Sequence, residues 1–160
     1  MKPFLLILVI FSAANICYAD DCTYDQEAQI ELLKSIVKSH PGGVLNAKEK
    51  IISCSTPSAS ASSVQYGGCE HLVFTITKNI SHSKKLSETE VFVLAGALAR
   101  EYWAPNDALA LSNSITEKTL SKDIMEDSTY YNIPSEFYYS FFIEHNSQKG
   151  YVSIEWGRNF

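Results

Sequence analysis

The sequence lacks the short motifs that mark the commonest catalytic sites. It contains no Gly-x-Ser-x-Gly nucleophile elbow, no Walker loop and no dinucleotide-binding glycine pattern, and no segment repeats another. The histidines are too far apart to form a metal clamp on one helix face, because none lies within four residues of another. These are His40, His71, His82 and His145. We therefore predict no resident metal and no cofactor.

A surplus of basic residues is also absent. The chain has 13 Lys and Arg residues against 18 Asp and Glu residues, a formal charge of -5. Loss of Lys2 with the leader described next leaves 12 of those 13 basic residues against the same 18 acidic ones, a formal charge of -6. Nucleic acids and anionic membranes attract basic proteins, so neither is an expected partner. A basic protein surface suits this chain better.

Long apolar runs are absent after residue 20, and the one apolar run stands at the start. Lys2 is followed by an almost unbroken apolar stretch from Phe4 to Ala14, and Ala19 offers the small residue that signal peptidase requires. The stretch is shorter than the ~20 residues of a membrane-spanning helix. We therefore predict a signal peptide at 1–19, export to the periplasm or beyond, no membrane span, and a single domain at 20–160.

Cysteines are few, and their number becomes odd once Cys17 leaves with the signal peptide. An oxidising compartment then favours one disulfide and one remaining thiol. We predict a bridge between Cys54 and Cys69, which flank one Ser/Ala-rich connection, whereas Cys22 stands alone before a helix. Such a bridge contributes about 3 kcal/mol in the chain-entropy description. The two pairings that use Cys22 stay open at this point.

Three segments have the apolar period of helices. The first runs from about Tyr24 to Ser39 and stops before Pro41. The second begins at a capping box, Ser87 with Glu90, and continues to about Tyr102. The third is expected to begin at Ala108 with Asn106 or Asp107 as its cap, and Ser112-Asn113-Ser114 predicts a break in its middle.

Four segments have sequence patterns that predict strands. Two are short and β-branched, at about 50–54 and 72–77, and two form a C-terminal hairpin at about 137–144 and 151–156. The segments 56–63 and 128–134 are expected to be irregular. The order of elements predicts an α+β fold, with a four-stranded antiparallel sheet and about three helices packed on one face.

Aromatic residues are unusually dense between Tyr130 and Phe142. The aromatic residues there are Tyr130, Tyr131, Phe137, Tyr138, Tyr139, Phe141 and Phe142. Neighbouring residues on a strand point to opposite faces, so they cannot all point toward the helices. Tyrosine-rich surface is typical of protein interfaces. We predict that Tyr138, Phe142 and Tyr151 line a binding face on the other side of the sheet.

Two weaker constellations bear on catalysis. Cys69 and His71 are two residues apart, a spacing that brings a thiol and an imidazole together only on a regular strand. Glu144 and Glu155 would form a carboxylate pair only if the hairpin register allows it. A disulfide explains Cys69 more simply, so we predict no catalytic residues and favour a protein that is not an enzyme.

The stretch Tyr66-Gly67-Gly68-Cys69-Glu70-His71, together with the signal peptide and the small acidic α+β body, resembles small periplasmic proteins of Gram-negative bacteria. Immunity proteins that neutralise cell-wall-attacking effectors are among them. The resemblance implies an exported inhibitor or immunity protein, and it assigns no functional residue. The alternative is a secreted envelope hydrolase acting on peptidoglycan or peptide, with Cys69 or a carboxylate pair as its chemistry.

Overall fold

The computed structural model describes residues 26–54, 60–67, 71–81, 85–133 and 139–159. The predicted signal peptide, Cys22, Cys69 and Tyr138 lie outside these residues. Within the described chain the elements are α1 (Gln26–Ser39), β1 (Gly43–Asn46), β2 (Ile51–Cys54), β3 (Ser63–Gly67), β4 (His71–Asn79), α2 (Glu88–Tyr102), α3 (Pro105–Glu117), β5 (Ser121–Met125), β6 (Ser128–Ile133), β7 (Tyr139–Asn146) and β8 (Tyr151–Asn159).

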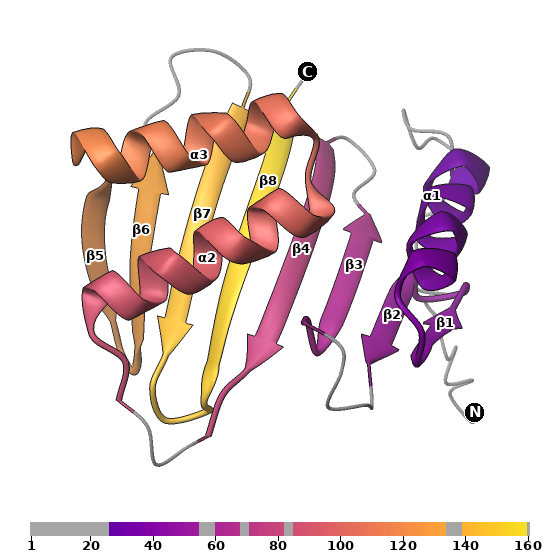
Figure 1. Cartoon of the computed structure of the whole chain (residues 1–160), viewed down its shortest axis with the longest axis horizontal. Helices are drawn as coiled ribbons and strands as arrows, with labels where there is room; N and C mark the ends of the chain where they lie inside the picture. The colour runs from indigo at the N-terminus through magenta and orange to yellow at the C-terminus, as the bar shows by residue number, and fades with distance from the viewer. Residues whose placement is uncertain (1–25, 55–59, 68–70, 82–84, 134–138, 160) are drawn as a thin grey trace, which may run out of the picture.

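All the strands form one antiparallel sheet in the order β1-β2-β3-β4-β8-β7-β6-β5 (Figure 1). The predicted α+β class and the number of helices are confirmed, but the predicted number of strands is wrong. The sheet has eight strands among the described residues, twice the expected four. The expected strands are β2, β4, β7 and β8, and β8 joins the two halves of the sheet by pairing with both β4 and β7.

One of the four missed strands, β5, has a weak sequence signal for a physical reason. β5 is exposed at all five positions, so burial does not impose an apolar alternation on it. Its Ile124 also lies four residues after Leu120, and this apolar spacing is typical of a helix. α3 instead ends at Glu117, where Lys118 takes a left-handed backbone conformation with φ of 56°.

The start of α2 is as predicted from the sequence, whereas the start of α3 differs from the prediction. At α2 the capping box is confirmed, because Ser87 Oγ accepts a hydrogen bond from Glu90 N and Glu90 Oε2 accepts one from Ser87 N. At α3 the expected cap is wrong. Ala104 is the N-cap and Pro105 follows it, a position where proline loses no helical hydrogen bond. The expected break at 112–114 is absent, since α3 runs through it.

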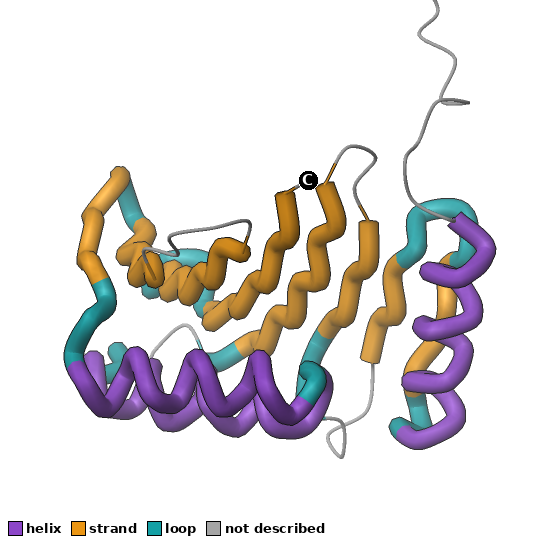
Figure 2. The backbone as a smooth tube through the Cα atoms, turned by 90° about the horizontal axis from the view of Figure 1, so that it is seen from above, coloured by secondary structure: helices purple, strands orange, loops and turns teal. Residues whose placement is uncertain are grey.

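The helices all pack on one face of the sheet, here called the inner face (Figure 2). Isoleucines from three strands meet side by side there: Ile76 pairs with Ile154, which pairs with Ile143, and each is fully buried. Leu33 of α1 and Leu111 of α3 are fully buried in the same core. Within the described residues, none of the helices is long and apolar enough to cross a membrane.

Candidate functional site

The two faces of the sheet differ in chemistry, and β7 shows the difference residue by residue. Phe141 and Ile143 are buried on the inner face, where the Phe141 ring lies 5.6 Å from that of Trp103. The alternate residues Phe142 and Glu144 point to the opposite face, called here the outer face. None of the described helices covers it (Figure 2). Among the described residues, Phe142 on this face is exposed and Glu144 is half-buried.

The candidate site lies on the outer face of β6, β7 and β8. Its members are Ser128 and Tyr130 of β6, Phe142, Glu144 and Asn146 of β7, and Tyr151 of β8. We call these six residues the outer-face site. All except Phe142 line a cavity of about 520 Å³, which the β5–β6 turn borders with Glu126 and Asp127. A volume of this size accepts several side chains of a partner or a small ligand.

Strand register explains why these residues meet. Asn146 lies between Ser128 on one side and Tyr151 on the other, and Glu144 lies directly opposite Tyr130. Residues directly opposite each other in an antiparallel pair have Cβ atoms about 4.5–5.5 Å apart. Three strands therefore place hydroxyls and a carboxylate within hydrogen-bonding distance, although they are far apart in the sequence.

Glu144 is the centre of the site, because a single oxygen of it accepts three hydroxyl groups. Tyr151 OH donates to Glu144 Oε1 at 2.6 Å, Ser128 Oγ donates at 2.7 Å and Tyr130 OH donates at 3.3 Å. The Tyr130 ring also packs edge-on against Phe142, with 6.1 Å between ring centroids. The two tyrosines are thus held in fixed orientations, so that little side-chain entropy remains to be lost on binding.

The surroundings of Tyr151 raise the pKa of its phenol group. Burial raises the pKa of this phenol, and the carboxylate of Glu144 raises it further, to about 12. Tyr151 is therefore neutral and remains a hydrogen-bond donor throughout the physiological pH range. It does not act as a phenolate nucleophile there.

Asn146 is a buried member of the site that holds its neighbours in position through hydrogen bonds. It is buried, its Nδ2 donates to Ser128 Oγ at 2.8 Å, and its Oδ1 accepts the backbone N–H of Lys149 at 2.7 Å. The second bond fixes the β7–β8 turn, which closes at Gly150 with a positive φ of 69°. The turn and the outer-face site are therefore tied together.

The outer face continues as a polar surface across β4 and β8. Thr77 and Ser153 share a hydrogen bond of 3.1 Å, and Thr75 donates to Glu155 at 3.2 Å. Glu155 lies opposite Phe142, while Glu144 lies opposite Ser153, so the two carboxylates are diagonal neighbours on one face. The register therefore does not place the two carboxylates opposite each other, which was the arrangement that the sequence left conditional; they lie one residue pair apart on the same face.

The charge of this face is negative. Glu144 and Glu155 share it with Asp123, which accepts a hydrogen bond from Asn132 Nδ2 at 3.2 Å. Glu126, Asp127 and Lys149 border the cavity. This face and the cavity border thus carry more acidic side chains than basic ones, and their negative charge has the same sign as the net charge of the chain.

Two of the three predicted binding residues belong to this site. Phe142 is 36 % exposed and Tyr151 is half-buried beside Glu144, both on the outer face. Tyr138 lies outside the described residues, so its placement stays a prediction. Sequence reasoning missed Ser128 because 128–134 was expected to be irregular, and it missed Asn146 because the expected strand ended at residue 144. The signal was present in the alternation of Ser128, Tyr130 and Asn132 with Thr129 and Tyr131.

The predicted cysteine bridge lies only partly within the described residues. Cys54 carries a free thiol at the end of β2, where burial raises its pKa and its N–H donates to Ser62 O. Its predicted partner, Cys69, is not described, so the bridge stays a prediction. Non-reducing peptide mapping decides the pairing.

A search for metal ligands gives no group of three or more His, Cys, Asp or Glu side chains among the residues that the structure describes. The described histidines are dispersed. His40 follows α1, and His145 lies on β7, where burial lowers its pKa.

Compared with protein-family models, with curated proteins and with solved structures, the chain has no significant match.

Proposed function

We propose that this protein is an exported binding protein whose outer-face site docks a basic protein partner, most concretely an inhibitor or immunity protein of the periplasm. The observation that carries the proposal is the arrangement around Glu144, where Tyr130 and Tyr151 are held by one carboxylate on a face without a helix. Ordered tyrosines beside an exposed phenylalanine are typical of binding hot spots.

Charge supports a basic partner. The outer face carries Asp123, Glu144 and Glu155, and the whole chain has a formal charge of -5. A partner with a basic surface is steered toward such a face and meets carboxylates there. An effector that attacks the cell wall fits this description when its active-site surface is basic, and covering that surface would neutralise it.

The test uses a defined basic effector, first the product of any toxin gene adjacent to the gene for this protein. We expect inhibition of that enzyme by the wild-type chain. Phe142→Ala and Tyr151→Ala should each weaken binding by at least ~2 kcal/mol, because truncated hot-spot aromatics commonly cost that much. Gln65→Ala, at an exposed outer-face position on the distant strand β3, is the matched control.

Unchanged affinity in both aromatic variants, with native circular dichroism, would show that the interface lies elsewhere. Wild-type affinity in the β3 control together with loss in both variants places it at the outer-face site. Cross-linking of the complex followed by mass spectrometry then gives an independent map of the contacts.

A second candidate is the envelope hydrolase, and the register favours it in one respect. Glu144 and Glu155 are diagonal neighbours on an open face, and paired carboxylates perform glycoside hydrolysis. However, Glu144 and Glu155 both accept hydrogen bonds from neighbouring hydroxyl groups, whereas hydrolysis requires one carboxyl group to donate a proton. Hydrolysis of purified peptidoglycan that disappears in both Glu144→Gln and Glu155→Gln would establish the hydrolase and displace the inhibitor proposal.

A further inference from the structure

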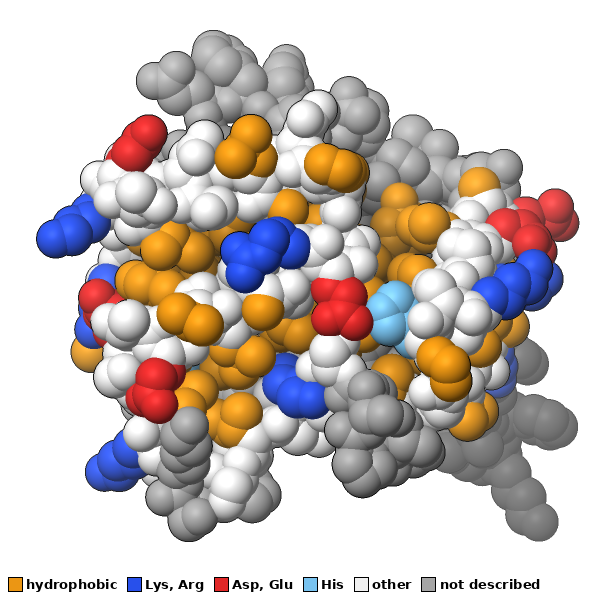
Figure 3. Space-filling model, viewed as in Figure 1, with side chains coloured by type: hydrophobic (Ala, Val, Ile, Leu, Met, Phe, Trp, Pro, Cys, Tyr) orange, Lys and Arg blue, Asp and Glu red, His pale blue; other side chains and the backbone are white. Residues whose placement is uncertain are grey.

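The helical layer on the inner face has a gap. α2 and α3 lie over one half of the sheet and α1 lies over the other, so that the strands between them are left partly uncovered (Figures 1 and 2). Hydrophobic side chains gather in the depression between α1 and the α2–α3 pair (Figure 3). A cavity of about 350 Å³ occupies this position. We call it the aromatic cleft.

Aromatic rings form the floor and one wall of the cleft. Tyr66 of β3, Phe74 of β4 and Trp156 of β8 rise from the inner face, and Tyr102 and Trp103 come from the end of α2. The Tyr66 and Phe74 rings meet edge-on at 5.3 Å between centroids. Five rings from four elements thus surround one space.

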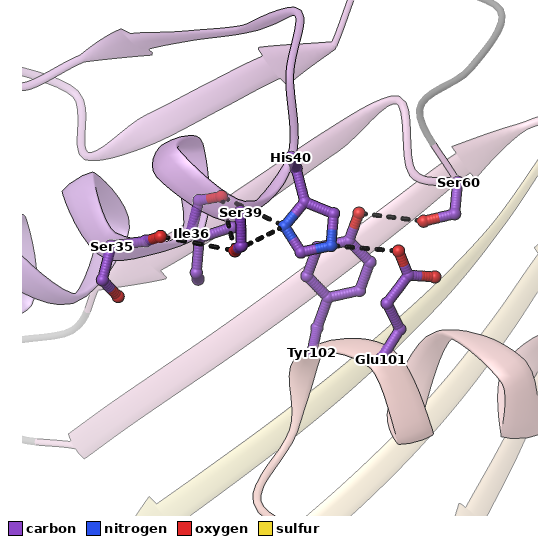
Figure 4. A network of polar contacts seen from close by, with 7 residues as sticks. All are labelled: Ser35, Ile36, Ser39, His40, Ser60, Glu101 and Tyr102. Carbon is purple, nitrogen blue, oxygen red and sulfur yellow. Dashed lines mark hydrogen bonds and ion pairs between the residues drawn. The ribbon is translucent and has the colours of Figure 1, made fainter.

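Contacts across the gap hold the two sides at a fixed spacing (Figure 4). His40, just after α1, stacks on Tyr102 with 4.7 Å between ring centroids, and its Nε2 lies 3.0 Å from Glu101 Oε1. The Tyr102 hydroxyl also shares a 3.0 Å hydrogen bond with Ser60 Oγ. The cleft is therefore pre-formed, which lowers the entropic cost of occupying it.

One carboxylate lies among these rings. Asp107, in the first turn of α3, is half-buried and is the single charged side chain among the described residues that line the cleft. Burial raises the pKa of Asp107, since the ionised carboxylate loses hydration there, while the Trp156 indole N–H offsets part of this effect. A cation beside Asp107 would restore the lost favourable interactions.

We propose that the aromatic cleft binds the guanidinium group of an arginine side chain presented by a protein or peptide. A guanidinium is planar, stacks on aromatic faces and pairs with a carboxylate through two hydrogen bonds, whereas an ammonium keeps its water more tightly. The cleft supplies ring faces and one carboxylate together. This site lies on the opposite side of the sheet from the outer-face site, and neither proposal depends on the other.

The chain provides its own reporter for this site. It contains two tryptophans, Trp103 and Trp156, and both line the cleft. Titration with the tripeptide acetyl-Gly-Arg-Gly-amide should therefore change the intrinsic fluorescence in a saturable manner. The same peptide with citrulline in place of arginine has the same shape without the charge, and it should bind at least about tenfold more weakly.

The variant Asp107→Asn removes the charge and keeps the size and shape of the side chain. It should weaken binding of the arginine peptide by about tenfold or more without changing the circular dichroism spectrum. Asp123→Asn, on the outer face, is the matched control and should bind the peptide as the wild type does. Tyr66→Leu, which removes one ring, should also weaken binding.

Three results would overturn this inference. They are the absence of a saturable fluorescence change with the arginine peptide, equal affinity for the citrulline peptide, and wild-type affinity in Asp107→Asn. Loss of binding in the Asp107 variant with wild-type binding in the Asp123 variant supports it. Because the readout needs no basic effector, failure here leaves the outer-face proposal standing, and the reverse also holds.

Discussion

The inner and outer faces of this sheet are made by the same strands but are stabilised in different ways. On the inner face, Ile76, Ile143 and Ile154 are fully buried by apolar packing. On the outer face of the same strands, Thr77, Glu144 and Ser153 form hydrogen bonds with other side chains. The inner face therefore supplies most of the folding free energy, whereas the outer face fixes side-chain positions and stays open to a partner.

The largest expected effect separates two residues that are neighbours in the chain. Ile143→Ala should lower the free energy of unfolding by about 2–5 kcal/mol, because it removes a fully buried side chain and leaves a cavity. Phe142→Ala, one residue earlier on the exposed face, should cost about 1 kcal/mol or less, as surface changes commonly do. Urea unfolding of both variants measures the difference. Equal losses would mean that the outer face is also covered.

A smaller effect is expected within the outer-face site. Glu144→Ala removes the acceptor shared by three hydroxyls, of which the Ser128 hydroxyl is buried. An unsatisfied buried polar group costs about 1–3 kcal/mol, so unfolding by urea should show a loss in this range.

Glu144→Gln is the matched control, since it keeps an acceptor at the same position. It should cost less than the alanine variant. The reverse order would mean that the negative charge of Glu144 is more important than its hydrogen bonds.

The smallest expected effect is a loss of folding stability at alkaline pH. Tyr151 has a pKa of about 12 in the folded protein and about 10 when unfolded, so the native state holds this proton more tightly. The contribution of this proton binding to folding stability is complete below about pH 10 and is lost as the pH rises toward 12. We expect the stability difference between the wild type and Tyr151→Phe to shrink between about pH 9 and about pH 11.

Urea unfolding at both pH values measures this difference, and the ultraviolet absorbance of tyrosinate follows the titration directly. Because Tyr151 is only half-buried, solvent screening keeps the change small. A tyrosine titration near the ordinary pKa that is present in the wild type and lost in Tyr151→Phe would contradict the close contact between Tyr151 and Glu144.

Some elements were predictable because local chemistry decides them. The capping box at Ser87 and Glu90 defines the start of α2 in any context, and the alternation around Gly150 predicts the hairpin of β7 and β8. α1 ends at Ser39, before Pro41, as expected. In each case the residues that carry the signal are within a few positions of the structure they determine.

Other elements were not predictable because their own residue patterns are weak, so that strand pairing or tertiary packing decides them. β5 is exposed at every residue and becomes a strand by pairing with β6, not by its own pattern. Likewise, α3 runs through 112–114 because Leu111 is buried and tertiary packing outweighs the weak helix propensity of that stretch. The small-residue segment before β3 contains Ala61, which is almost fully buried against the core.

The sequence by itself determined the net acidity, the α+β class, the three helices, and the surplus of aromatic residues on alternating strand positions. Only the tertiary structure decided which groups meet. Glu144 meets Ser128 and Tyr130 through the register of β6 with β7, and Trp156 meets Asp107 and Tyr66 through the gap between helices. Alternation along a strand specifies the face of a side chain, but its neighbours on that face depend on pairing and packing between segments far apart in the chain.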